Sequence, residues 1–363
     1  MFRRTSVPAS ACQRPGGARS WGRGLRRAVL LWCTGGLLTL AGAQNLGQFG
    51  GGGAAPAGPP QRSVTEWLAR LQQASRVPSY VGTFVVSSAS GALSSSRIWH
   101  VCEGDVQLER VDTLTGTPRS TVRRNDTVMT FLPDARVVTL DQRQQGAVFP
   151  NLLSPAAGQP VADFYDVREL GRGRVAGCDA DIVQLLPRDA WRFGYRIWSE
   201  NRTGLVLKTQ TLDAQGRVLE QAAFSELQLD APVQAEQLRQ MMASTQGYRL
   251  VQAEQARTTP QAEGWQLSAV VPGFEARNCY RRPLSGTASL VQCIFSDGLA
   301  TVSLFMQPLE AAQHPREGAA SMGATQALTR RVTDRSGHWW ITAVGEVPSA
   351  TLQAFVQGLA RIP

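Results

Sequence analysis

The chain from Tyr80 to Asp230 is a succession of short runs rich in Val, Thr and aromatic residues, separated by Gly, Asn-Asp and Pro-Asp turn signals. Such runs predict antiparallel strands joined by tight turns. The predicted strands cover 80–88, 97–102, 106–112, 120–124, 127–132 and 136–141, followed by 182–186, 191–199, 205–212 and 218–229. A sheet of about ten strands must curl, because few helices are available to cover its apolar face.

An amphipathic helix is predicted immediately before these strands. Ser63 and Glu66 have the spacing of a capping box, and the apolar residues from Val64 to Leu71 recur at i, i+3, i+4 and i+7. A second, short helix is predicted over 161–170. A curved sheet around a helix leaves a cavity for apolar ligands unless side chains fill it, and a filled core fits the pattern equally well. The candidates for lining a lipid cavity are Trp67, Leu71, Phe84, Phe131, Phe164, Phe193, Tyr195 and Ile197.

The run that begins at Trp191 has a clear alternation. Phe193, Tyr195 and Ile197 alternate with Arg192 and other small or charged residues. Because successive side chains of a strand point to opposite faces, this pattern predicts an aromatic face and a polar face, with Arg192 on the polar one.

The chain divides into five predicted segments. Residues 1–43 are a signal peptide, and 44–62 are a Gly/Pro-rich tether that cannot bury a core. Residues 63–230 form the curved-sheet domain, and 231–261 a linker rich in Gln, Ala and Glu with a helix over 235–243. Residues 262–363 form a small α+β domain. Its predicted strands are 266–270, 275–280, 289–295, 300–307 and 338–344, and a helix over 349–361 closes the chain.

The predicted signal peptide has a charged start, a short apolar middle and a small-residue end. Arg26 and Arg27 precede the apolar stretch, and Ala41 and Ala43 form the cleavage pattern. An uncleaved anchor is the alternative, although the stretch is short for a membrane span. Residues 1–43 hold seven of the 37 basic residues and no acid, so the rest of the chain is nearly neutral. Nucleic acid is therefore disfavoured as a partner, because its binding requires a basic surface.

Export changes the expected chemistry of cysteine. Four cysteines follow residue 43, and an even number in an oxidising compartment favours disulfides over metal binding or thiol chemistry. Cys279 and Cys293 lie at equal distance from Gly286, in a predicted hairpin turn, so they are predicted to face each other and form a bridge. A pairing of Cys102 with Cys178 follows only by elimination. Buried thiols are the alternative for both pairs.

No pattern in the sequence indicates catalysis. The three histidines, His100, His314 and His338, are scattered, and neither His-Glu-x-x-His nor Cys-x-x-Cys occurs. A Gly-x-Ser-x-Gly nucleophile elbow is also missing. We therefore expect a protein that is not an enzyme and that holds no metal and no cofactor. A secreted hydrolase with an unrecognised site is the alternative.

The run from Trp191 to Leu229, WRFGYRIWSENRTGLVLKTQTLDAQGRVLEQAAFSELQL, resembles the signature stretch of the RseB/MucB proteins, which are periplasmic regulators of the envelope-stress sigma factor. Further similar segments are CDADIVQLLPRD at 178–189, VPGF at 271–274, YRRPL at 280–284, SDGLATVSLF at 296–305 and ITAVGEVPSATLQAFVQGL at 341–359. No single segment is specific for the family. The specific feature is that all of them occur in the family's order across both predicted domains. The tether and the four cysteines depart from the family pattern.

The resemblance implies a first domain like the lipoprotein carriers LolA and LolB, with a half-open antiparallel sheet around a helix, and a smaller second domain. It also implies a periplasmic negative regulator that binds the periplasmic part of a single-pass anti-sigma factor and shields it from regulated proteolysis. Lipid or lipopolysaccharide would release the partner. Arg281 and Arg282 are candidates for contacting an acidic partner or a lipid phosphate, with a merely solvated role as the alternative. A lipid or lipoprotein carrier is the competing function, although a simple carrier of this type would end near Asp230.

Overall fold

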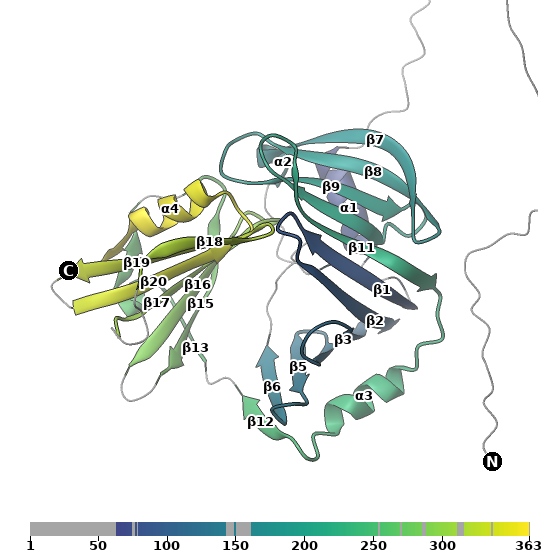
Figure 1. The fold of residues 1–363 in the computed structure, drawn as a ribbon, viewed down its shortest axis with the longest axis horizontal. Helices are drawn as coiled ribbons and strands as arrows, with labels where there is room; N and C mark the ends of the chain where they lie inside the picture. Colours follow the sequence, from purple (N-terminus) through teal and green to yellow (C-terminus); the bar gives the residue numbers. More distant parts are fainter. Residues whose placement is uncertain are drawn as a thin grey trace, which may run out of the picture. The chain divides into compact units, whose positions relative to one another are not determined.

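The computed structural model describes residues 63–74, 77, 79–142, 149, 161–252, 255–268, 271–284, 288–310, 316–334 and 337–362. The predicted signal peptide and tether lie outside the described residues. Most of the described chain is β-strand, arranged in two large sheets and one small one (Figure 1). The predicted fold class, mainly β with a curved antiparallel sheet and a packed helix, is confirmed.

The first sheet has twelve strands in the order β12-β6-β5-β4-β3-β2-β1-β11-β10-β9-β8-β7. All of its pairings are antiparallel except that of β12 with β6, which is parallel. The strands are β1 (Ser79–Ser88), β2 (Leu93–Glu103), β3 (Val106–Thr113), β4 (Ser120–Arg124), β5 (Thr127–Leu132), β6 (Val137–Gln142), β7 (Tyr165–Val175), β8 (Cys178–Pro187), β9 (Gly194–Glu200), β10 (Val206–Leu212), β11 (Val218–Leu229) and β12 (Arg249–Gln252). Because β12 and β7 are separate edges, the sheet curves without closing into a barrel.

Helix α1 (Val64–Ala74) begins with the predicted capping box. The backbone N–H of Ser63 donates to Oε2 of Glu66 at 2.8 Å, and the N–H of Glu66 donates back to Oγ of Ser63 at 3.2 Å. Two N–H groups that have no partner within the first turn are thereby satisfied. The apolar stripe of the helix packs against β7, β8, β9 and β10 through Trp67 and Leu71.

The helix predicted over 161–170 is mostly a strand. Helix α2 covers only Val161–Phe164, and β7 continues from Tyr165 in a long hairpin with β8. The register of β7 with β8 shifts between Glu169 and Gly171, where Gly171 has a φ of 94°. Tertiary pairing with β8 therefore overrides the weak helical pattern.

The predicted linker contains regular structure. Helix α3 (Ala235–Ala243) agrees with the predicted helix and packs against β3 and β4. The segments after it add β12 to the first sheet and β13 (Ala256–Thr258) to the second. The boundaries of the two predicted domains at 230 and 262 stay predictions.

The second sheet has seven strands in the order β13-β15-β16-β17-β20-β19-β18. The remaining elements are β14 (Trp265–Leu267), β15 (Glu275–Pro283), β16 (Ser289–Ser296), β17 (Thr301–Pro308), β18 (Gly318–Met322), β19 (Thr325–Asp334), β20 (Gly337–Gly345), α4 (Ser349–Gly358) and β21 (Leu359–Arg361), with a 3-10 turn at Gln261–Glu263. The strands β18 and β19 have no counterpart in the prediction. Helix α4 lies against β19 and β20 (Figure 1) and buries Leu352 and Phe355.

Among the described residues, no helix combines the length and the apolar character needed to cross a membrane.

The two pairs of cysteines differ in the structure. Cys279 on β15 stands directly opposite Cys293 on β16, and a disulfide joins them. The predicted turn between these strands, at 285–287, lies outside the described residues. Cys102 and Cys178 are thiols, so the pairing inferred by elimination is not formed. They lie on β2 and on β8, which are not neighbours in the sheet.

Replacing Cys279 and Cys293 together by alanine should lower the free energy of unfolding by about 3 kcal/mol, because a short cross-link restricts the unfolded chain. Urea unfolding of the oxidised protein measures this difference. A reductant should bring the wild-type protein to the stability of the variant and leave the variant unchanged. Peptide mapping without reductant should recover the linked pair; thiols at both positions would refute the bridge.

Candidate functional site

Four of the eight predicted cavity residues lie in one apolar cluster between α1 and the first sheet. Trp67 and Leu71 come from α1, Tyr195 and Ile197 from β9, and all four are at most 8% exposed. Phe164 from α2 packs against the same cluster and is partly buried. Other buried members of the cluster are Val161, Tyr165, Val183, Leu185 and Val206.

The other three candidates lie elsewhere. Phe84 belongs to a neighbouring cluster, where its ring meets Phe224 edge-on with centroids 6.2 Å apart. Phe131 belongs to a third cluster and packs edge-on against Tyr248 at 5.5 Å. Phe193 is buried near the start of β9. The structure thus places seven of the eight residues in or against three separate apolar clusters, and a common lipid cavity stays a prediction.

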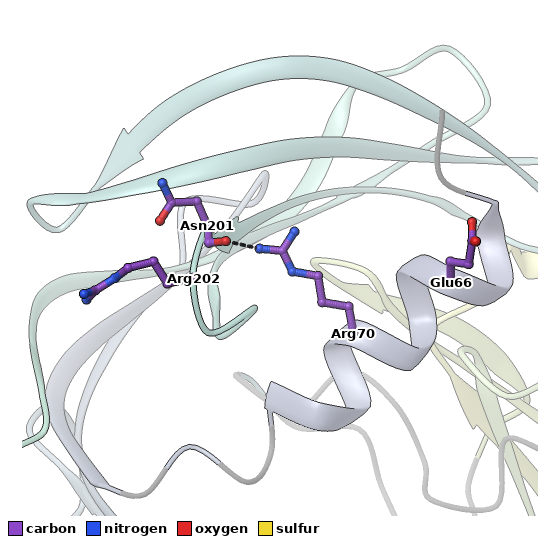
Figure 2. A pocket seen from close by; sticks show the side chains of 4 residues that line it. All are labelled: Glu66, Arg70, Asn201 and Arg202. Carbon is purple, nitrogen blue, oxygen red and sulfur yellow. Dashed lines mark hydrogen bonds between the residues drawn. The ribbon is translucent and has the colours of Figure 1, made fainter. Parts of the chain in front are cut away.

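A pocket at the surface of the first sheet has a polar lining. Glu66 and Arg70 on α1 line it together with Asn201 and Arg202, which lie in the turn between β9 and β10, and Figure 2 shows Arg70 reaching toward Asn201. Arg70 donates to the backbone carbonyl of Asn201 and, at 3.0 Å, to Oδ2 of Asp181. None of the predicted cavity residues lines this pocket.

The turn that forms one wall of this pocket is held by a buried carboxylate. Glu200 accepts hydrogen bonds from the backbone N–H of Arg202 at 3.1 Å and from the N–H and Oγ1 of Thr203, both at 2.7 Å. Burial acts to raise the pKa of Glu200, but these hydrogen bonds and the charge of Arg202 outweigh it and lower the pKa. Glu200 is thus kept ionised and orders the turn, which leaves the Arg202 side chain 74% exposed.

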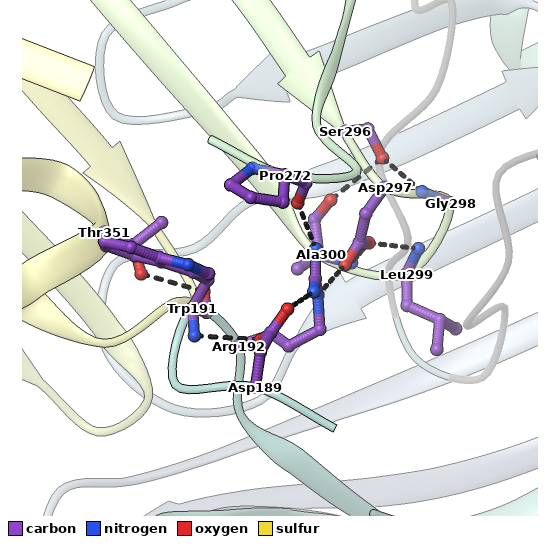
Figure 3. Close-up of polar contacts among 10 residues, drawn as sticks. All are labelled: Asp189, Trp191, Arg192, Pro272, Ser296, Asp297, Gly298, Leu299, Ala300 and Thr351. Atoms are coloured by element: carbon purple, nitrogen blue, oxygen red, sulfur yellow. Dashed lines mark hydrogen bonds and ion pairs between the residues drawn. The ribbon is translucent and has the colours of Figure 1, made fainter. Parts of the chain in front are cut away.

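A fully buried ionic site is built around Arg192, whose side chain is 0% exposed (Figure 3). Its Nε donates to Oδ2 of Asp297 at 2.7 Å, its Nη2 donates to the carbonyl of Pro272 at 2.7 Å, and its Nη1 pairs with Asp189. Asp189 and Arg192 precede β9 in the first sheet, whereas Asp297 follows β16 in the second. The guanidinium therefore contacts segments that are far apart in the sequence.

Asp297 is fixed by its own tight turn between β16 and β17. Its Oδ1 accepts from the backbone N–H of Leu299 at 2.9 Å and of Ala300 at 2.7 Å. Burial raises the pKa of Asp297, and the hydrogen bonds and the Arg192 charge only partly oppose that effect. A carboxylate in this position depends on Arg192 for its compensation.

Aromatic rings enclose the Arg192 guanidinium. Its Cζ lies 4.3 Å from the centroid of Phe164 and 5.2 Å from that of Phe274. Gly273, in the predicted Val-Pro-Gly-Phe turn, has a φ of 81°, and a Cβ there would lie 2.5 Å from Phe164. Only glycine fits, because both the backbone conformation and the space exclude a side chain. This cation–π packing replaces part of the hydration that the guanidinium loses.

The prediction that Arg192 lies on the polar face of a strand beginning at Trp191 was wrong. The predicted strand from 191 begins only at Gly194, so residues 191–193 do not follow the alternation of β9. Trp191 and Arg192 are instead turned into the site, where the carbonyl of Trp191 accepts from Oγ1 of Thr351 at 2.8 Å (Figure 3). The sequence signal that could have indicated this site is the Ser-Asp-Gly turn at 296–298, which supplies the matching carboxylate.

The two candidate partner-binding arginines lie on the strand β15. The side chain of Arg281 is 56% exposed, and its Nε lies 3.7 Å from Oε1 of Glu263. Arg282 donates from Nη2 to Oε1 of Gln255 at 3.1 Å. The structure thus leaves Arg281 more available than Arg282 for another molecule.

Within the described ranges, no group of three or more His, Cys, Asp or Glu side chains has the arrangement of a metal site. His100 and His338 lie in different sheets, and His314 lies outside the described residues.

Two family models match the chain. The MucB/RseB N-terminal domain matches residues 63–242, and the MucB/RseB C-terminal domain matches residues 259–360. The sigma factor AlgU regulatory protein MucB of Pseudomonas aeruginosa is 31% identical, over 80% of this chain and 88% of that protein. The sigma-E factor regulatory protein RseB of Haemophilus influenzae is 24% identical, over 81% of this chain and 90% of that protein.

Solved structures agree with these matches. The crystal structure of MucB in complex with MucA(peri) has a TM-score of 0.64 at 27% identity, covering 83% of this chain and all of that one. A second complex structure, of Pseudomonas aeruginosa MucA/MucB, has a TM-score of 0.65 at 28% identity, covering 82% and 99%.

Replacing Arg192 by methionine should lower the free energy of unfolding by about 3 to 5 kcal/mol, because Asp297 would remain buried without its partner. Chemical unfolding measures the loss. The matched control is Arg188→Met, since Arg188 is 48% exposed in its pair with Asp166, and losing an exposed ion pair should lower the stability far less. Adding Asp297→Asn to the Arg192→Met variant should recover part of the loss. Equal losses in the two single variants would contradict the assigned importance of Arg192.

Proposed function

Because the chain belongs to the MucB/RseB family, we propose that it is a negative regulator of sigma-factor signalling that binds the periplasmic part of a membrane anti-sigma factor. The observation that carries this proposal is the likeness to MucB solved with MucA(peri), which extends over the full length of that MucB chain. Binding would shield the anti-sigma factor from regulated proteolysis.

The periplasm is the compartment in which this activity would take place. The predicted signal peptide supports export, and the Cys279–Cys293 disulfide is a cross-link that persists in oxidising compartments. The relatives named above are regulatory proteins, which fits a chain that acts by binding and not by catalysis.

The Arg192 site gives this proposal a physical basis. The residues of this site come from both regions matched by the family models. Asp189 and Arg192 lie in 63–242, and Asp297 lies in 259–360. A buried ion pair with fixed hydrogen-bond directions favours one arrangement of the segments that supply it. We infer that this arrangement presents the surface that the anti-sigma factor binds, and that Arg281 contacts acidic groups of that partner.

Release by lipid would require a modest free-energy difference. A ligand that favours the partner-free state by roughly 2 to 3 kcal/mol lowers partner affinity some tens to a hundredfold. Burial of apolar surface contributes roughly 25 cal/mol per Å², so burying about a hundred Å² of acyl chain would supply this free-energy difference. Since Trp67, Leu71, Tyr195 and Ile197 are already packed together, an acyl chain would enter by displacing α1 from the sheet. A carrier function is not favoured, because the second matched region lies beyond the part that a simple carrier requires.

The full chain should bind the purified periplasmic part of the anti-sigma factor from the same organism in a pull-down and in titration calorimetry. Arg281→Glu and Arg282→Glu should each weaken binding about tenfold, equivalent to about 1.4 kcal/mol. Arg172→Glu is the matched control, because this arginine is 85% exposed on β7. Failure of the wild-type chain to bind would overturn the proposed function. Unchanged affinity in both β15 variants would overturn only the assigned contact.

Lipopolysaccharide added to the preformed complex should lower partner affinity some tens to a hundredfold. The control is the same polysaccharide without its acyl chains, which should leave the complex intact because no apolar surface is available for burial. Competition calorimetry measures both. A complex that survives lipopolysaccharide, or that dissociates equally with the deacylated sugar, would reject release by lipid.

A further inference from the structure

A row of polar side chains crosses the first four strands of the first sheet. In the strand register, Tyr80 on β1 stands opposite His100 on β2, His100 opposite Glu109 on β3, and Glu109 opposite Arg123 on β4. Cys102 follows His100 by two residues on β2, and alternate residues of a strand point to the same face. The row therefore places a thiol, an imidazole, a carboxylate and a guanidinium on one side of the sheet.

His100 is fixed in this row on three sides. Its ring stacks on Tyr80 with centroids 4.7 Å apart and planes 14° apart. Its Nδ1 lies 3.5 Å from Oε2 of Glu109, and its Nε2 lies 3.2 Å from Sγ of Cys102. The imidazole is 2% exposed, so the ring cannot turn away from either neighbour without repacking. A thiol, an imidazole and a carboxylate are thus in contact, in that order.

The surroundings favour a charged imidazole. Burial acts to lower the pKa of His100, but the hydrogen bond with Cys102, the close contact with Glu109 and the charges of both groups outweigh it and raise the pKa to about 9. Burial likewise acts to raise the pKa of Glu109, and His100 and Arg123 outweigh it and lower the pKa. The ionisable groups facing His100 are therefore Tyr80, Cys102 and Glu109, with Arg123 behind the carboxylate.

We propose that Cys102 is a thiol-modification site, at which Cys102, activated by His100 and Glu109, forms a mixed disulfide with a small disulfide compound. An imidazolium next to sulfur stabilises the thiolate, which is the nucleophilic form of cysteine. The proposal rests on the contacts of Cys102, His100 and Glu109 alone, so it stands independently of the proposed function.

Cys102 lies next to the last residue of β2. Cys102 is half-buried, and the turn that follows it, Glu103 to Asp105, is exposed. Cys178 has a different environment, since it is 6% exposed and lies in an apolar cluster with Ile98 and Phe224. Cys102 lies beside the buried His100, and Cys178 lies in an apolar core. The reactivity of the two thiols can thus be compared within one protein.

The reaction is a thiol–disulfide exchange. Cys102 releases its proton to water, and the resulting thiolate, stabilised by the charged His100, attacks one sulfur of the small disulfide. A bond forms between Cys102 and that sulfur, while the original sulfur–sulfur bond breaks. The leaving thiolate takes a proton from His100 or from water. Cys102 is oxidised, and the departing half of the small disulfide is reduced, so no further oxidant is needed.

The test follows each cysteine of the folded full chain separately. The chain is treated with an aromatic disulfide, 5,5′-dithiobis(2-nitrobenzoate), and with oxidised glutathione at pH 6, and the peptides containing Cys102 and Cys178 are quantified by mass spectrometry. Cys102 should react at least about ten times faster than Cys178, because an ordinary thiol is mostly protonated at this pH. Equal rates, or a slower reaction at Cys102, would overturn the proposal.

Variants assign the activation to the neighbouring groups. His100→Gln should slow the reaction of Cys102 at pH 6 about tenfold, and Glu109→Gln should slow it less, while neither changes the rate of Cys178. Cys102→Ser should abolish labelling of its peptide. An unchanged rate in His100→Gln would overturn the assigned role of the imidazole.

A measurement on the wild-type chain covers the case in which a variant fails to fold, as judged by circular dichroism. The rate at which Cys102 reacts with the small disulfide should then be compared between the native protein and the same protein unfolded in urea at pH 6. Folding should accelerate its reaction about tenfold if His100 activates it. A slower reaction in the native state would overturn the proposal without any variant.

Discussion

The Arg192 guanidinium has lost all contact with water, and the segments around it are arranged to compensate for that loss. Asp297 and Asp189 supply charge, Pro272 supplies a carbonyl, and Phe164 supplies a ring face. Removing one partner of such a site leaves an uncompensated charge, whereas a surface pair can be lost at little cost. The turn after β16 and the loop before β9 are therefore held in place by the same interaction.

This interaction also links the fold to the proposed regulatory activity. The residues that meet at Arg192 come from both regions that match the MucB/RseB family models. A regulator that must bind a partner and later release it needs a state that is well defined but that a modest free energy can change. The buried Arg192 site, combined with apolar clusters that do not hold all the predicted lipid contacts together, meets this requirement.

Local sequence patterns predicted many of the elements. The strands β4 and β5 coincide with the predicted ranges, and the capping box of Ser63 and Glu66 forms as expected, because both depend on neighbouring residues. The hairpin that places Cys279 opposite Cys293 is also a local feature. The strand β7 was missed, since its stability comes from pairing with β8 and not from its own apolar pattern.

By itself, the sequence determined the succession of short strands, the amphipathic helix before them and the position of the cysteine hairpin, because alternation and turn residues act over a few positions. Only the tertiary structure decided which distant side chains meet. Arg192 and Asp297 are far apart in the chain, and His100 meets Glu109 through the register of two strands. Periodicity specifies the face on which a side chain lies, whereas the partner across that face depends on how the whole sheet curves and pairs.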